Sequence, residues 1–196
     1  MPRPRIDRDE ARARIVVTAN RLFRQYGHTK TTVADIAAEL RMSPANIYKF
    51  FASREAIVEA SVEINLAVLR KRLEEAVRQA RKPVEKLEAA VLAMIRENKD
   101  SLRNERQLYK LVLMATENNW ACVQDYIDSV IGVLADIIAE GNRTGEFRIA
   151  DVTETAQLLF GCLQSLIHPL LTQDIEQAEL EKTAIAQVRL LVKALR

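Results

Sequence analysis

The chain has 196 residues and only five Gly and five Pro, and helix-forming residues dominate between them, so we expect an all-α fold. Two distant cysteines, Cys122 and Cys162, without ligand-spaced partners exclude a disulfide framework and a zinc site, and we expect both to be buried; the lack of a long apolar run or signal peptide indicates a cytoplasmic protein. The net charge of +2 is divided unevenly: residues 1–54 carry 11 Lys and Arg against 5 Asp and Glu, and residues 55–196 carry 18 against 22, a pattern typical of polyanion binding or of a solvated basic helix.

Three closely spaced helices are expected at the start of the chain, and the second and third are short. "IDRDEARARIVVTANRLFRQYG" repeats its apolar residues at helical spacing, with Asp7 as a plausible N-cap and Gly27 as the stop. "TTVADIAAEL" begins with a capping-box pattern at Thr32, and Ser43 before a proline starts a third helix. Two short helices joined by a turn of about three residues predict a helix-turn-helix at about residues 32–51.

Longer amphipathic helices follow, and turn signals separate them at 140–147 and 168–174. We expect them at about 53–81, 83–101, 104–117, 120–140, 151–172 and 174–195, which gives about nine helices in total. The segment 151–172 is apolar nearly all round, so it is either the centre of the bundle or completed by a partner subunit. Together with 174–195 it is the predicted homodimer interface.

The third helix divides into two faces when it is projected at about 100° per residue. Ile47 and Phe51, with Phe50 near the edge, should pack against the two preceding helices. The opposite side carries short or polar residues at the end that meets bases when such a helix enters a major groove. Asn46 suits adenine, and Lys49 suits guanine or phosphate. The predicted DNA-binding residues are Thr31, Thr32, Ser43, Pro44, Ala45, Asn46, Tyr48, Lys49 and Arg54, although the hydroxyls serve equally well as helix caps.

The stretch "TTVADIAAELRMSPANIYKFFASREAIV", preceded by "ANRLFRQYGHTKT", resembles the head of the TetR/AcrR family of bacterial transcriptional regulators. The resemblance covers about residues 9–69. Three positions depart from the family pattern: Arg41, or Leu40 in another alignment, replaces the turn glycine, Ala45 replaces a helix glycine, and Phe50 replaces a phosphate-binding residue. A left-handed turn at a non-glycine residue costs about 1 kcal/mol, so Arg41 indicates a different turn or tolerated strain, offset by one more phosphate contact.

The resemblance implies a DNA-binding domain at 9–69 and a ligand-binding and dimerisation domain at 70–196, in which the head precedes an antiparallel helical bundle. Such proteins bind a palindromic DNA operator as homodimers and release it when a small-molecule effector binds the body. No charged residue except His168 stands at a position that periodicity makes apolar, which favours a hydrophobic effector. The candidate effector-binding residues are Met94, Tyr109, Leu113, Met114, Trp120, Tyr126 and Phe160, although a side chain of this kind is more often plain core.

Two alternatives remain open from the sequence. A DNA-binding activator or nucleoid-type factor needs no inducer, and a helical carrier or enzyme would keep the head only as a structural element. An enzyme should show paired carboxylates, a Cys/His pair or a metal cluster, and the sequence shows none of these. We therefore expect no catalytic residue, no metal and no cofactor.

Overall fold

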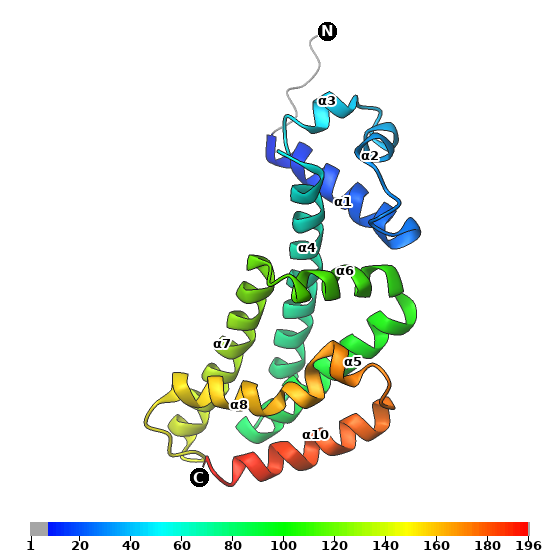
Figure 1. The fold of residues 1–196 in the computed structure, drawn as a ribbon. Helices are drawn as coiled ribbons and strands as arrows, with labels where there is room; N and C mark the ends of the chain where they lie inside the picture. The colour runs from blue at the N-terminus through cyan, green and yellow to red at the C-terminus, as the bar shows by residue number, and fades with distance from the viewer. Residues whose placement is uncertain (1–7, 196) are drawn as a thin grey trace. The chain divides into compact units, whose positions relative to one another are not determined.

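The computed structural model describes residues 8–195, and within that range the chain forms ten helices and no strand (Figure 1). The helices are α1 Arg8–Tyr26, α2 Val33–Glu39, α3 Pro44–Ile47, α4 Arg54–Gln79, α5 Pro83–Asn104, α6 Arg106–Glu117, α7 Ala121–Thr144, α8 Val152–Ile167, α9 Pro169–Thr172 and α10 Gln177–Val192. The predicted all-α class is therefore confirmed. Asp7, the expected N-cap of α1, lies outside the described residues.

The helix expected at 151–172 is broken into α8 and α9, which raises the number of helices above nine. The break falls at His168, whose backbone is extended, with φ −73° and ψ 122°. The following residue, Pro169, disfavours the helical conformation in the residue before it and has no amide hydrogen to continue the helix. The local sequence therefore accounts for the break.

The described residues divide into two units. One unit contains the residues up to Asn65 together with Glu105–Asn118, and the other contains Leu66–Asn104 and the residues from Asn119 onward. The first unit therefore holds α1, α2, α3 and the first part of α4 together with α6, which is distant in sequence. Nothing in the sequence pattern indicated that α6 belongs to the same unit as α1, α2 and α3.

Within the first unit, α6 packs against α1, whose buried stripe is Ile15, Val16, Ala19, Leu22 and Phe23. The Nη1 atom of Arg24 lies 3.3 Å from Oε1 of Glu105, which is the residue just before α6. Gly27 ends α1 with φ 85°, and a Cβ added there would lie 3.0 Å from Gln107 Oε1 of α6. Glycine is thus favoured at the end of α1 both by its backbone conformation and by the approach of α6.

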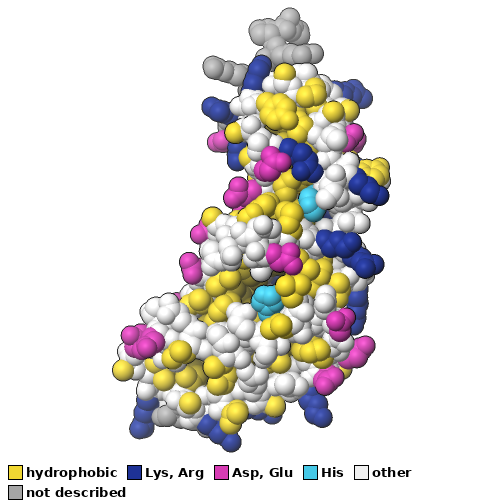
Figure 2. All heavy atoms as spheres, in the orientation of Figure 1, with side chains coloured by type: hydrophobic (Ala, Val, Ile, Leu, Met, Phe, Trp, Pro, Cys, Tyr) yellow, Lys and Arg dark blue, Asp and Glu magenta, His cyan; other side chains and the backbone are white. Residues whose placement is uncertain are grey.

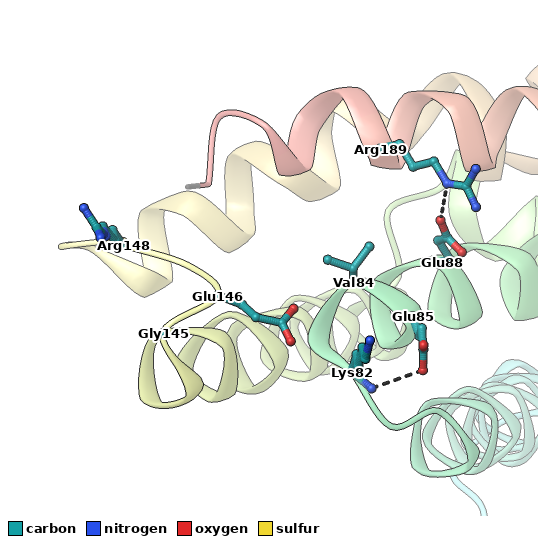
Figure 3. Close-up of a pocket in the computed structure, with 8 residues that line it drawn as sticks. All are labelled: Lys82, Val84, Glu85, Glu88, Gly145, Glu146, Arg148 and Arg189. Atoms are coloured by element: carbon teal, nitrogen blue, oxygen red, sulfur yellow. Dashed lines mark hydrogen bonds and ion pairs between the residues drawn. The ribbon is translucent and has the colours of Figure 1, made fainter.

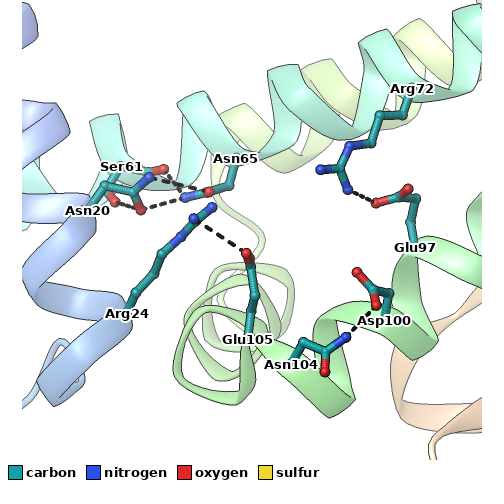
Figure 4. A network of polar contacts seen from close by, with 9 residues as sticks. All are labelled: Asn20, Arg24, Ser61, Asn65, Arg72, Glu97, Asp100, Asn104 and Glu105. Carbon is teal, nitrogen blue, oxygen red and sulfur yellow. Dashed lines mark hydrogen bonds and ion pairs between the residues drawn. The ribbon is translucent and has the colours of Figure 1, made fainter.

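A polar network joins α1 to α4 in the core of the first unit (Figure 4). The Asn65 amide nitrogen donates to Asn20 Oδ1 at 2.9 Å and to the Ser61 carbonyl at 2.6 Å. The Ser61 hydroxyl also donates to Asn20 Oδ1, at 2.9 Å. Ser61 and Asn65 are 0% and 5% exposed, so these bonds satisfy groups that water does not reach.

In the second unit, α7 continues past the turn predicted at residue 140 and ends only at Gly145, which has φ 78°. Gly141 lies inside the helix, where a Cβ would stand 2.0 Å from Cδ2 of the buried Phe147. Gly141 therefore marks a close approach of Phe147 to the helix and not a stop signal.

A buried cation fastens α5 to α9 in the second unit. Lys99 is only 6% exposed, and its ammonium donates to the carbonyls of Thr172 at 2.5 Å and Gln173 at 3.1 Å. The neighbouring Asn98 amide donates to the carbonyl of Ile167, at the end of α8, at 2.7 Å. The expectation that only His168 is charged on an apolar face is therefore wrong, because Lys99 lies four residues after Ile95 on the buried stripe of α5.

Candidate DNA-binding interface

The helix-turn-helix of the first unit consists of α2, a tight turn and α3. Thr32 caps α2, and its capping box is complete: Thr32 Oγ1 accepts from the Asp35 amide at 3.2 Å, and Asp35 Oδ2 accepts from the Thr32 amide at 2.8 Å. The Thr32 hydroxyl also donates to Asp35 Oδ2, at 2.7 Å, and this bond, followed by the one from the Thr32 amide, lowers the pKa of Asp35. Ser43 caps α3 by accepting from the Asn46 amide at 3.3 Å. Both predicted caps are therefore formed.

Arg41 takes the left-handed conformation in the turn, with φ 55°. Its amide donates to the Ala38 carbonyl at 3.0 Å, and the Met42 amide donates to the Ala37 carbonyl at 2.8 Å. These two bonds are the Schellman pattern that closes a helix, with Arg41 at the position where glycine is most common. Leu40 is right-handed, with φ −85°, so the turn keeps the expected left-handed form and it is Arg41 that occupies this position.

The segment that begins with α3 has one buried and one exposed side, as its helical projection predicts. Ile47 and Phe51 are 0% and 2% exposed, and Phe50 is half-buried. Tyr48 and Lys49 are exposed, with half of the Tyr48 surface open to solvent. Of the remaining residues predicted to face DNA, Pro44, Ala45 and Ser43 are exposed and Asn46 is half-buried.

Thr31 and Arg54 are engaged in contacts within the first unit. Thr31 is 3% exposed, and its hydroxyl donates to the Gly27 carbonyl at 2.9 Å. The Arg54 guanidinium donates to the carbonyls of His28 and Thr31. Both side chains therefore hold the connection between α1 and α2. Burial of the imidazole, followed by the charge of Arg54, lowers the pKa of His28.

Sequence reasoning missed the contribution of Arg12 to this region. Its Nη1 donates to the Phe50 carbonyl at 2.9 Å, and its guanidinium lies over the ring of Phe51. Arg12 is four residues before the buried Val16 of α1, so it falls on the stripe that faces the core. The presence of a cation on the core-facing stripe of α1 was the sequence signal that could have indicated this contact.

The seven candidate effector-binding residues are shared between the two units. Tyr109, Leu113 and Met114 belong to the first unit, and Met94, Trp120, Tyr126 and Phe160 belong to the second. In the second unit, Met94 is part of the hydrophobic core, and Tyr126 and Phe160 pack against it. Burial of the phenol, with a smaller effect of the Glu97 carboxylate, raises the pKa of Tyr126 to about 12. These three side chains therefore contribute to core packing.

Two surface hollows in the second unit are lined mainly by charged side chains. The larger has a volume of about 790 Å³ and lies between the start of α5, the end of α7 and α10. Figure 3 shows Arg189 paired with Glu88 on its wall. The Arg189 Nε lies 2.8 Å from Glu88 Oε1. The smaller, about 320 Å³, lies between α4 and α7. Neither hollow is lined by any of the seven candidates.

The outer faces of α8 and α10 form an uncharged surface in the second unit. Its exposed residues follow helical spacing and are Leu158, Gly161, Cys162 and Ser165 on α8 and Thr183, Ala186, Leu190 and Ala194 on and just after α10. Leu158 and Leu190 are 64% and 65% exposed. Figure 2 shows hydrophobic and uncharged side chains across this face, with charged side chains around its edges.

The expectation of two buried cysteines holds for Cys122 and is wrong for Cys162.

Some other features bear on the class of protein. None of the helices in the described range combines the length and the apolar character needed to cross a bilayer. Residues 8–195 contain no group of three or more His, Cys, Asp or Glu side chains that could hold a metal ion. His168 ends α8, and its Nδ1 is buried without a hydrogen-bond partner among the described residues.

Several solved structures share the fold. A TetR-family transcriptional regulator from Pectobacterium atrosepticum is 20% identical, with a TM-score of 0.73, over 98% of this chain and 97% of its own. A protein from Mesorhizobium loti described as a TetR-family transcriptional regulator is 17% identical, with a TM-score of 0.71, over 96% and 98% of the two chains. RolR, solved in complex with the ligand resorcinol, is 18% identical, with a TM-score of 0.66, over 94% of each chain. No curated protein matches the chain in sequence.

Two family models match the sequence directly. The model described as bacterial regulatory proteins, tetR family, matches residues 15–61, which include the helix-turn-helix. The model described as tetracyclin repressor-like, C-terminal domain, matches residues 83–188, more than half of the chain. The chain therefore belongs to the tetR family of bacterial regulatory proteins.

Proposed function

We propose that the protein is a ligand-responsive transcriptional repressor that binds a palindromic operator as a homodimer and leaves it when a small hydrophobic effector binds. The observation that carries the proposal is the division of the segment 44–51 into two faces. Ile47 and Phe51 anchor it in the core, while Tyr48 and Lys49 stand exposed beside it. An anchored helix with an exposed polar face is the arrangement that reads bases in a major groove.

In the proposed complex, direct contacts come from α3 and from the two helix N-termini. Asn46 pairs with adenine, Ala45 meets a thymine methyl group, and Lys49 reaches guanine or phosphate. Tyr48 and the capped N-termini at Thr32 and Ser43 bind phosphates. Pro44 allows close approach of the backbone. Thr31 and Arg54 act by holding the connection before α2, because their polar groups are engaged there.

The proposed dimer forms through α8 and α10, within the segments 151–172 and 174–195. The uncharged surface described above supports this choice, because burying the exposed side chains of Leu158 and Leu190 against a second copy would stabilise the dimer. Doubling the half-sites also roughly squares the discrimination between DNA sequences. Replacing both leucines by Glu should give a monomer in light scattering, and a dimer in that variant would place the interface elsewhere.

We further propose that residues 9–69 serve DNA binding and residues 70–196 serve effector binding and dimerisation in a cytoplasmic protein. The effector-binding role of the seven candidates is part of this proposal. Resorcinol, the ligand of the structurally similar RolR, is a small aromatic molecule and therefore a suitable first compound to test. A ligand releases DNA only through a difference in its affinity for the bound and free states.

The proposal is tested with duplexes that the purified protein selects from a randomised pool. Tyr48→Ala and Lys49→Ala should each weaken binding to the selected duplex in a gel-shift titration while circular dichroism and light scattering stay unchanged. Wild-type affinity should also fall steeply with salt, because several phosphates are contacted in each head. A pool from which no duplex is enriched would overturn the proposed function.

A further inference from the structure

Arg41 stands where the backbone favours a different residue. It occupies the left-handed position of the Schellman turn after α2, with φ 55°, and glycine takes this conformation without steric cost. A side chain with a Cβ at this position strains the backbone. Strain of this kind persists where the side chain itself is useful, so the guanidinium of Arg41 needs a role.

Four other arginines of the first unit are held by contacts within that unit. Arg21 pairs with Glu39 at 2.5 Å, and Arg24 pairs with Glu105. Arg12 and Arg54 donate to backbone carbonyls. The exposed side chain of Arg41 makes no ion pair or hydrogen bond with any described residue. Its five N–H donors are therefore available to a ligand.

The position of Arg41 suits a contact beside the recognition helix. It lies two residues before Ser43, the N-cap of α3, whereas the exposed Lys49 follows the other end of α3. When a helix enters a major groove, the phosphates of the two strands flank it. Cations before and after α3 are placed to reach these phosphates, and the planar fork of an arginine matches two phosphate oxygens at once.

We propose that Arg41 binds an operator phosphate in each half-site and that this contact offsets the strain of its left-handed backbone. The inference rests on the proposed function and adds a contact that the helix-turn-helix pattern does not assign. It makes an unusual prediction, because the side chain lowers the stability of the free protein and raises its affinity for DNA. A residue with only a structural role would not affect the two quantities in opposite directions.

The experiment compares Arg41→Gly, Arg41→Gln and Arg41→Lys with Lys110→Gln. Lys110 is an exposed cation of α6 in the same unit, so its variant makes the same change of charge away from the turn. Each full-length protein is titrated by fluorescence anisotropy with the duplex that the wild type selects, at several salt concentrations. Melting temperatures of the free proteins are measured in parallel.

We expect Arg41→Gly and Arg41→Gln to lower operator affinity about threefold to tenfold for each head. The slope of log affinity against log salt should become shallower by about 1.8 for a dimer, because one phosphate contact is lost in each head. Arg41→Gly should also raise the melting temperature. Arg41→Lys should keep the slope with weaker binding, and Lys110→Gln should match the wild type.

Two results would overturn the assignment while leaving the proposed function intact. One is wild-type affinity and slope in Arg41→Gln, and the other is an equal loss in Lys110→Gln, which would show a general effect of charge. Failure of the wild type to bind any selected duplex would instead overturn the proposed function itself. The two failures are thus distinguished by the wild-type titration.

Discussion

The guanidinium carbon of Arg12 lies 4.2 Å from the centroid of the Phe51 ring. The same side chain donates to the Phe50 carbonyl at 2.9 Å, so a residue of α1 holds the segment that follows α3 by two contacts. A cation over an aromatic face and a hydrogen bond to a carbonyl each stabilise the folded state modestly. Together they fix the end of the recognition segment on α1.

Removing this side chain should therefore loosen the recognition segment. We expect Arg12→Ala to lower the free energy of unfolding by about 1–2 kcal/mol and to weaken DNA binding. Arg14→Ala is the matched control, because Arg14 is an exposed cation of the same helix. Urea denaturation followed by circular dichroism measures both variants. Equal stability of the two would show that the contacts of Arg12 contribute nothing measurable.

The contribution of the network of Asn20, Ser61 and Asn65 to stability should require all three side chains together. Asn65→Ala leaves polar atoms of Asn20 and Ser61 buried with fewer partners, which costs about 1–3 kcal/mol. The triple variant Asn20→Leu, Ser61→Ala, Asn65→Leu removes all the side-chain partners together and should be destabilised less than the single variant. Urea denaturation provides the comparison. A triple variant with a lower free energy of unfolding than Asn65→Ala would contradict this account.

Two glycines of α7 should respond to alanine in opposite directions. Gly141→Ala places a methyl group 2.0 Å from Phe147 Cδ2 and should cost about 1–3 kcal/mol through overpacking. Gly132 has no atom within 4 Å of an added Cβ, so Gly132→Ala should stabilise the helix by about 0.5–1 kcal/mol. Thermal denaturation of the two variants tests the pair. Changes of the same sign would argue against the close approach of Phe147.

Lys99 should contribute to stability through the carbonyls that it satisfies. Lys99→Met leaves the Thr172 carbonyl without its buried donor and should lower the free energy of unfolding by about 1–3 kcal/mol. Lys182→Met, at an exposed position of α10, is the control and should change stability by less than about 0.5 kcal/mol. Chemical denaturation separates the two. An unchanged free energy of unfolding in Lys99→Met would show that the hydrogen bonds of Lys99 do not stabilise α9.

The lowered pKa of His28 predicts a pH dependence of stability. Burial and Arg54 depress the pKa in the folded state, so the unfolded state binds more protons as the pH falls through about 6.5. The free energy of unfolding should therefore decline below that pH and level off below the folded pKa. His28→Gln should remove this component between pH 5 and 8. Parallel stability curves for the wild type and the variant would show that His28 is not responsible.

The sequence was sufficient to predict the all-helical class and the order of most of the helices, because capping residues and apolar periodicity are local signals. Thr32 and Ser43 form the expected caps, and Ile47 and Phe51 are buried as projected. The turn expected at 140–147 began too early, because a glycine such as Gly141 serves either as a stop or as a site of close packing, and only the tertiary position of Phe147 decides between them.

The cations show most clearly what the sequence could not predict. Arg12 and Lys99 both lie on buried stripes, where a long side chain can bring its charged end to a backbone carbonyl. Which carbonyl is within reach depends on how the helices pack, so the pattern shows an unusual position without its partner. The same reason explains why the sequence did not show that Arg54 donates to carbonyls before α2.

The membership of α6 in the first unit has a consequence for synthesis on the ribosome. The surface of α1 that meets Glu105 and Gln107 cannot be covered when Asn65 emerges, because Leu66–Asn104 must be translated first. At about 5–20 residues per second this interval lasts about 2–8 s. The nascent first unit therefore spends seconds without α6, and a gene fragment cut after Asn65 encodes a unit in which this surface of α1 stays uncovered.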